Sequence, residues 1–160
     1  MVTNLNQSKI TMVKHFSEIK MTYRTDKRYK DLPTIREPEE AARLLRRLWD
    51  KGTLELREEF MILILNAAKL CTGWCKMSTG GQTATIVDPA GVFRVALQTN
   101  AHSIIIAHNH PSNNCTASHA DIQLTKRIHE AGRVLGVQLE DHIILCPDGS
   151  YVSLRSKGLF

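Results

Sequence analysis

Two histidines and one aspartate within residues 107–121 (AHNHPSNNCTASHAD) have types and spacing that suit a metal centre. His108 and His110 follow the apolar stretch 103–107, which predicts a short buried strand. Because alternate residues of an extended chain point to the same side, both imidazoles face one direction. Asp121 lies beyond a polar loop that is long enough to curl back. Zinc binds imidazole and carboxylate in tetrahedral sites, so we expect His108, His110 and Asp121 to hold one zinc ion, with water as the fourth ligand.

A simpler role accounts for part of the same stretch. Ser118 and Asp121 have the spacing of a capping box at a helix start, where Glu or Gln is commoner at the third helical position. Capping alone explains Ser118 and Asp121 without a metal, but it leaves His108 and His110 unexplained. The two roles can coexist, because a capped helix start would hold the carboxylate in place. His119 is an alternative ligand from the same loop, although the spacing favours Asp121.

Catalysis by a zinc-activated water also requires a general base, usually a carboxylate. Glu58 and Glu59 directly precede the continuous apolar stretch 60–65 (FMILIL), which predicts a strand buried on both faces. Glu58 shares the parity of Phe60 and Glu59 that of Met61, so periodicity leaves both as candidates. Both are equally explained as solvated charges at the end of a strand.

Another histidine, His142, falls within the predicted strand 137–146. It suits a residue that hydrogen-bonds to a metal ligand, and it suits a structural histidine equally well.

Cysteines occupy positions 71, 75, 115 and 146. The N-terminus lacks the apolar core of a signal peptide, and no apolar run approaches the roughly 20 residues of a membrane span. We therefore expect a cytoplasmic protein without membrane association, whose thiols stay reduced. Cys115, between the metal ligands, is expected to be a bystander.

The rest of the sequence predicts the elements that position these residues. Helices are indicated by apolar stripes at helical spacing, and strands by apolar or alternating stretches. The two types interleave, which indicates an α/β or α+β protein with helices packed on a mixed sheet. The predicted helices span 38–49, 89–99 and 122–135; the predicted strands span 18–23, 60–65, 71–77, 83–87, 103–107, 137–146 and 151–154, with a turn at 78–81.

The length of 160 residues suits one domain. We divide it into an N-terminal extension, residues 1–35, that is partly ordered, and a domain at residues 36–160. The net charge of +5 permits contact with nucleic acid or an acidic partner. Arg43, Arg46 and Arg47 can contact phosphate, although a solvated helix face explains them better.

The spacing His108-x-His110-Pro111, six residues, then Ser118-x-x-Asp121 resembles the JAMM motif of the JAB1/MPN metalloprotease superfamily. Over residues 38–158 the chain is most similar to the C-terminal domain of the RadC family. The similarity is carried by EEFMILILN (58–66), NAHSIIIAHNHPS (100–112), TASHADIQLTKRI (116–128), LEDHIIL (139–145) and YVSL (151–154).

The resemblance implies a JAB1/MPN-like fold, with the layered architecture of cytidine deaminases, and a role for each site residue. His108, His110 and Asp121 would bind zinc. Glu58, which matches the family's glutamate, would take the proton from the zinc-bound water, and Ser118 would donate a hydrogen bond to the oxyanion. The implied reaction is hydrolysis of a peptide or isopeptide bond in a peptide or protein substrate.

The chain also departs from the family pattern. Asn113 stands where the family commonly has Gly, Ala117 where it has Pro, and Ala90-Gly91 where it has Arg-Glu. The family's name keeps a second hypothesis open, a DNA-repair-associated or nucleic-acid-binding accessory protein whose metal is structural. The sequence leaves the oligomeric state open as well, since the strand at 18–23 can pair within the domain or in a dimer.

Overall fold

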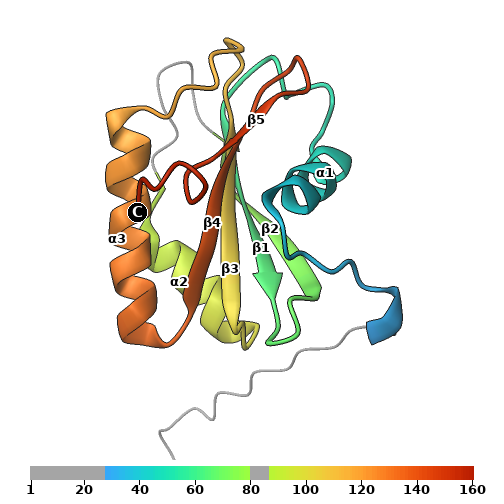
Figure 1. The fold of residues 1–160 in the computed structure, drawn as a ribbon, viewed down its shortest axis with the longest axis vertical. Coiled ribbons are helices and arrows are strands. Elements are labelled where there is room, and N and C mark those ends of the chain that lie inside the picture. Colours follow the sequence, from blue (N-terminus) through green and yellow to red (C-terminus); the bar gives the residue numbers. More distant parts are fainter. Residues whose placement is uncertain (1–27, 80–86) are drawn as a thin grey trace, which may run out of the picture.

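A mixed five-stranded sheet forms the centre of the computed structural model, which describes residues 28–79 and 87–160. Its strand order is β2-β1-β3-β4-β5, in which only the β3–β4 pair is parallel. Figure 1 shows α1 on one face of the sheet, and α2 and α3 on the other. The elements are η1 (Tyr29–Asp31), α1 (Pro38–Leu48), β1 (Glu59–Leu65), β2 (Cys71–Thr79), α2 (Pro89–Gln98), β3 (Ser103–Asn109), α3 (His119–Leu135), β4 (Gln138–Leu145) and β5 (Tyr151–Ser153).

The two faces of the sheet carry separate apolar cores. Met61, Leu63 and Leu65 of β1 pack with α1, whereas Phe60 and the even-numbered residues that follow pack with α2 and α3. Every residue of β1 and β3 is buried. Central strands covered on both faces have continuous apolar sequences, as the stretch 60–65 predicted. The expected class, helices packed on a mixed sheet, is confirmed.

The parallel strands β3 and β4 are joined by α3, as a parallel pair requires a crossover. α3 therefore begins near the carboxyl end of β3 and runs back toward the start of β4. α3 ends at Gly136, which adopts φ of 71°, and lies close against the start of β4. A Cβ on Gly132 would lie 2.3 Å from the Val137 carbonyl oxygen, so only glycine permits this approach. This unit brings the start of α3 beside the end of β3.

The boundaries differ from prediction where pairing or capping extends an element. β3 continues through His108 to Asn109, and α3 begins at His119 rather than at 122. Ser78 was expected in a turn but lies in β2, because its pairing with Phe60 continues the ladder.

Two leucines of the predicted helices 89–99 and 122–135 lie outside the core. Leu97 is 48% exposed and Leu135 is 44% exposed. Each lies in the last turn of its helix, beyond the last buried residue, which is Ala96 in α2 and Gly132 in α3.

Some predictions fall outside the described residues: the strand at 18–23, most of the strand at 83–87, and residues 80–81 of the turn. Of the N-terminal extension, residues 28–35 are described. Thr34 pairs with Leu70, and Ile35 is buried in the core beside α1. In the part of the chain described, no helix has the length and apolar character needed to cross a membrane.

Candidate metal centre

His108 lies near the end of β3, on the sheet face covered by α2 and α3. Its register partner on β1 is Phe60, whose ring stacks on the imidazole with centroids 6.5 Å apart and planes 9° from parallel. Only 5% of His108 is exposed. The Phe60 ring therefore forms an apolar wall that keeps water from one side of the imidazole.

His110 lies just beyond β3 and is held at both its backbone and its ring. Its backbone N–H donates to the Leu145 carbonyl at 2.9 Å. Its Nδ1 lies 2.5 Å from the carbonyl oxygen of Asn114. A carbonyl only accepts hydrogen bonds, so Nδ1 carries a hydrogen, and Nε2 is the ring atom that faces His108 and Asp121.

Asp121 lies in the first turn of α3, where Ser118 is the N-cap. The Asp121 backbone N–H donates to Ser118 Oγ at 3.1 Å, and the Ser118 backbone N–H donates to Asp121 Oδ2 at 2.7 Å. The predicted capping box is thus confirmed. It also fixes the direction of the carboxylate, which points toward the two histidines, so capping and proximity to the histidines coexist.

The three side chains form one compact group of nitrogen and oxygen atoms. His108 Nε2 lies 2.9 Å from His110 Nε2 and 3.3 Å from Asp121 Oδ1. His110 Nε2 lies 3.8 Å from Asp121 Oδ2. Among the described residues, these three form the group of His, Cys, Asp and Glu side chains that can hold a metal ion.

The spacing of these atoms fits a small cation. Two ligands about 2.0–2.1 Å from zinc lie about 3.3 Å apart at a tetrahedral angle. The separations of 2.9, 3.3 and 3.8 Å between the atoms of this group bracket that value. Two imidazole nitrogens and a carboxylate oxygen are a donor set that zinc accepts, and it leaves a fourth position open.

His108 is connected to a further buried histidine. His108 Nδ1 lies 2.7 Å from His142 Nε2, and His142 Nδ1 lies 2.6 Å from the Thr125 hydroxyl. Burial lowers the pKa of His108 to about 4, an effect that Asp121 opposes and His110 reinforces. Burial also lowers the pKa of His142 well below its ordinary value, with help from the neighbouring imidazoles. Both rings are therefore neutral near pH 7, the form in which imidazole binds metals.

The two candidate bases lie side by side at the start of β1. Glu59 is buried beside α1, with its carboxylate bonded to Thr53 and paired with Arg57 and Lys76. Burial raises its pKa, but these hydrogen bonds outweigh that effect and the pKa is lowered. Glu58, half-buried, precedes Phe60 by two residues.

Strand alternation extends the face of Phe60 and His108 to Glu58. Continuing the antiparallel register from Phe60–His108 brings Glu58 level with His110. This extrapolated register agrees with Glu58 as the base, a role that stays a prediction.

Asn109, between the two histidines, points to the other face of the sheet and is buried. Its side-chain oxygen accepts from the Glu59 backbone N–H at 2.8 Å. Its side-chain nitrogen donates to the carbonyls of Leu54 and Arg57, at 2.7 and 2.9 Å. Asn109 thus holds the segment that carries Glu58.

Two residues near the site, Thr125 and Asn109, are absent from the motif but have a spacing that indicates their position. Thr125 follows Asp121 by four residues, a spacing that places both on one face of a helix. Asn109 alternates with the histidines, which implies contacts on the opposite face of the sheet. Neither Thr125 nor Asn109 has an ionisable side chain, which is why the motif alone does not indicate them.

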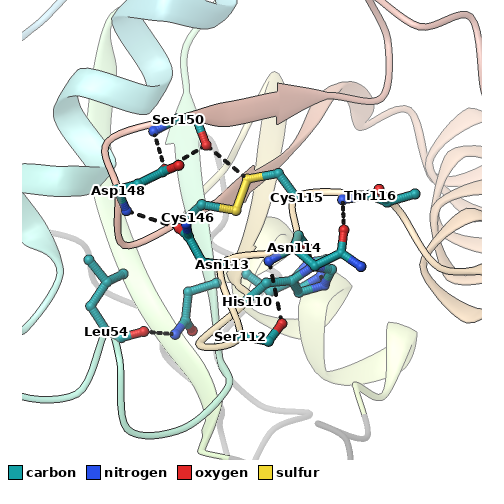
Figure 2. Close-up of a disulfide and its surroundings, with 12 residues drawn as sticks. Leu54, His110, Ser112, Asn113, Asn114, Cys115, Thr116, Cys146, Asp148 and Ser150 are labelled. Atoms are coloured by element: carbon teal, nitrogen blue, oxygen red, sulfur yellow. Dashed lines mark hydrogen bonds between the residues drawn. A yellow bond between two sulfur atoms is a disulfide. The ribbon is translucent and has the colours of Figure 1, made fainter.

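The loop between the ligands is tied down by a disulfide that was not expected. Cys115 is bonded to Cys146 at the end of β4, with Cα atoms 5.9 Å apart (Figure 2). The expectation that these two thiols are reduced is wrong for this structure, because the returning loop places Cys115 against the end of β4. Cys71 and Cys75, both in β2, lie outside this disulfide. The same loop is also held by Asn113, whose side-chain oxygen accepts from the Asp148 backbone N–H at 3.1 Å (Figure 2).

The fold and the site together define the class of protein. It is an α+β domain in which a parallel crossover brings two histidines and an aspartate together as a potential metal centre. The sequence model of the family described as RadC-like JAB domain matches residues 35–159, and the chain belongs to this family. The resemblance inferred from the motif is confirmed.

Relatives in several bacteria share this region. A UPF0758 protein of Shouchella clausii is 41% identical over 128 residues, which cover 80% of this chain and 54% of the relative. A UPF0758 protein of Clostridium beijerinckii is 34% identical over 160 residues, which cover 99% of this chain and 67% of the relative. The chain spans about half the length of the first of these curated relatives. Their names state no activity.

One departure from the family pattern has a structural explanation. Asn113, which stands where the family commonly has Gly, adopts a φ of 61°. This left-handed conformation favours Gly, but Asn tolerates it better than most residues. The substitution therefore preserves the path of the loop between the ligands.

Proposed function

We propose that the protein is a zinc-dependent hydrolase of the JAMM type that cleaves a peptide or isopeptide bond. The observation that carries the proposal is the convergence of His108 Nε2, His110 Nε2 and the Asp121 carboxylate within 4.8 Å of one another. Two imidazole nitrogens that converge beside a carboxylate suit a cation, and membership of the RadC-like JAB family supports zinc, one ion per chain.

Each residue has a proposed part in the reaction. Bound zinc would lower the pKa of a water to about 7 and polarise the scissile carbonyl. Glu58 takes a proton from the attacking water and passes it to the leaving amine. Ser118 Oγ accepts a hydrogen bond from the Asp121 backbone, which leaves its own O–H able to donate to the oxygen of the tetrahedral intermediate. Phe60 excludes water from one side of His108.

Metal analysis of protein purified without added zinc or chelator tests the proposal first. We expect about one zinc per chain, lost in Asp121→Ala and in His110→Ala, because each removes a ligand. His119→Ala is the matched control, since His119 lies on the same helical turn but outside the group. Protein that stays empty after zinc is offered contradicts the proposal.

The proposed base is tested with a peptide library. Glu58→Gln should keep its zinc but lose about 10²–10⁴-fold in hydrolysis, because an amide cannot take the proton. Full activity in Glu58→Gln removes Glu58 as the base.

The DNA-associated alternative receives less support. Arg46 donates to the Cys146 and Ser150 carbonyls, and Arg43 pairs with Glu39, so neither guanidinium is aimed only at solvent. A salt titration of DNA binding tests this alternative. DNA binding at low salt that weakens steeply as salt is added would favour it, and no binding at low salt would exclude it.

The proposal includes a cytoplasmic location. In that compartment, reducing thiols would compete with the Cys115–Cys146 disulfide.

A further inference from the structure

The hydroxyl group of Thr125 has its hydrogen position determined by its neighbours. Thr125 Oγ donates to the Asp121 backbone carbonyl, with the two oxygens 2.6 Å apart. A hydroxyl has one hydrogen to donate, so its contact with His142 Nδ1, at 2.6 Å, requires the imidazole to donate. His142 therefore carries its hydrogen on Nδ1.

The same logic extends to the metal ligand. In the neutral His142 ring, a hydrogen on Nδ1 leaves a lone pair on Nε2. That lone pair lies 2.7 Å from His108 Nδ1, so His108 must donate from Nδ1. The Nε2 atom of His108 then presents its own lone pair toward His110 Nε2, 2.9 Å away, so that without a metal the hydrogen in this contact comes from His110. Thr125 and His142 have no exposed surface, and burial opposes a charged alternative to this arrangement.

We propose that Thr125 and His142 form a positioning relay that fixes the tautomer of His108, so that its Nε2 is always available to a metal. The metal-binding part of this inference rests on the proposed function, whereas the tautomer assignment does not. Neither residue touches the metal or the reacting atoms.

The relay joins two ligands that come from different elements. Thr125 bonds to the backbone of Asp121 in α3, and through His142 of β4 it orients His108 of β3. Without the hydroxyl, the His142 ring loses the acceptor that selects its tautomer. His108 can then carry its hydrogen on Nε2. That hydrogen must move to Nδ1 before Nε2 can bind a metal.

Nitrogen-15 NMR of the metal-free protein at neutral pH tests the tautomers directly. We expect the hydrogen on Nδ1 in both His108 and His142, with Nε2 unprotonated. The isosteric Thr125→Val should move both rings toward the other tautomer, and Thr125→Ser should restore them. Unprotonated Nδ1 atoms in the unaltered protein would overturn the relay without the need for any variant.

Zinc affinity, measured by competition with a chromophoric chelator, tests the consequence. Thr125→Val should bind zinc about 10–100-fold more weakly, the range seen when a group supporting a ligand is lost. Thr125→Ser should bind as the unaltered protein does. Thr99→Val is the matched control, because Thr99 also donates to a carbonyl four residues earlier, at 2.8 Å, but at the end of α2. Equal losses in Thr99→Val and Thr125→Val, or no loss in Thr125→Val, would overturn the relay.

The two proposals fail in different ways. Correct tautomers in a protein that binds no zinc would leave the relay intact and remove the zinc hydrolase. Zinc binding with the opposite tautomer of His108 would remove the relay and leave the metal centre.

Discussion

The tripeptide His108-Asn109-His110 serves both faces of the sheet at once. The histidines point toward Asp121, while the buried Asn109 side chain makes three backbone hydrogen bonds, two to the segment before β1 and one to its first residue. One of these uses its oxygen as an acceptor, and two use its nitrogen as a donor. Asn109 therefore has a structural role that aspartate cannot fill.

Asn109→Asp should lower the free energy of unfolding by about 3–5 kcal/mol. The substitution removes the donor to two carbonyl oxygens and leaves a buried carboxylate beside them. Asn66→Asp is the matched control. Asn66 uses its side-chain oxygen to accept from Ala68 and Leu70, which aspartate also does. Urea unfolding of both variants measures the difference, and equal stability would show that the donor contacts of Asn109 contribute little.

At the scale of elements, the loop between β3 and α3 depends on contacts with the β4–β5 turn. The Cys115–Cys146 disulfide joins them over a sequence separation of 31 residues (Figure 2). Asn114, next to Cys115, supplies the carbonyl that orients His110. The disulfide therefore lies one residue from a contact that positions a proposed ligand.

Removing this disulfide with the double change Cys115→Ser and Cys146→Ser should cost about 2–4 kcal/mol of stability in oxidised protein, since the unfolded chain gains freedom. Zinc binding should also weaken, because the Asn114 carbonyl is held less firmly. Cys75→Ser, at a free thiol in β2, is the control. Urea unfolding and zinc competition, with and without a dithiol reductant, measure both effects. Identical behaviour of oxidised and reduced protein would contradict the prediction.

At the scale of the whole molecule, burial between the sheet and α3 keeps two histidines neutral. The folded-state pKa of His108 is about 4, against an ordinary value of 6.5. The unfolded chain therefore binds more protons than the folded chain between these two pH values, and stability falls as the pH falls through this range. Above pH 6.5 the contribution is fully present.

The metal-free protein should therefore lose about 3 kcal/mol between about pH 7 and pH 4 from His108 alone, at 1.36 kcal/mol per pKa unit. His142, whose pKa is also lowered, adds to this loss. Urea unfolding at a series of pH values measures it. His142→Gln should flatten the dependence because one buried imidazole is gone, and a flat profile in the unaltered protein would show that the imidazoles are not buried as neutral groups.

The local features of the fold could be predicted from the amino-acid sequence. The FMILIL stretch predicted β1, the Ser118–Asp121 spacing predicted the capped start of α3, and alternation predicted that His108 and His110 share a side. Each depends on residues close in the chain, where backbone geometry fixes direction. The motif and its flanking segments also indicated the family, which the match over residues 35–159 confirms.

The tertiary structure decided what depends on segments distant in the chain. The parallel crossover brings Asp121 to the histidines, and the pairing of β1 with β3 sets Phe60 level with His108. Thr125 and His142 come from α3 and β4, and Cys115 meets Cys146 only after the loop returns. Local periodicity carries no information on such long-range contacts, because they depend on how the helices and strands pack together.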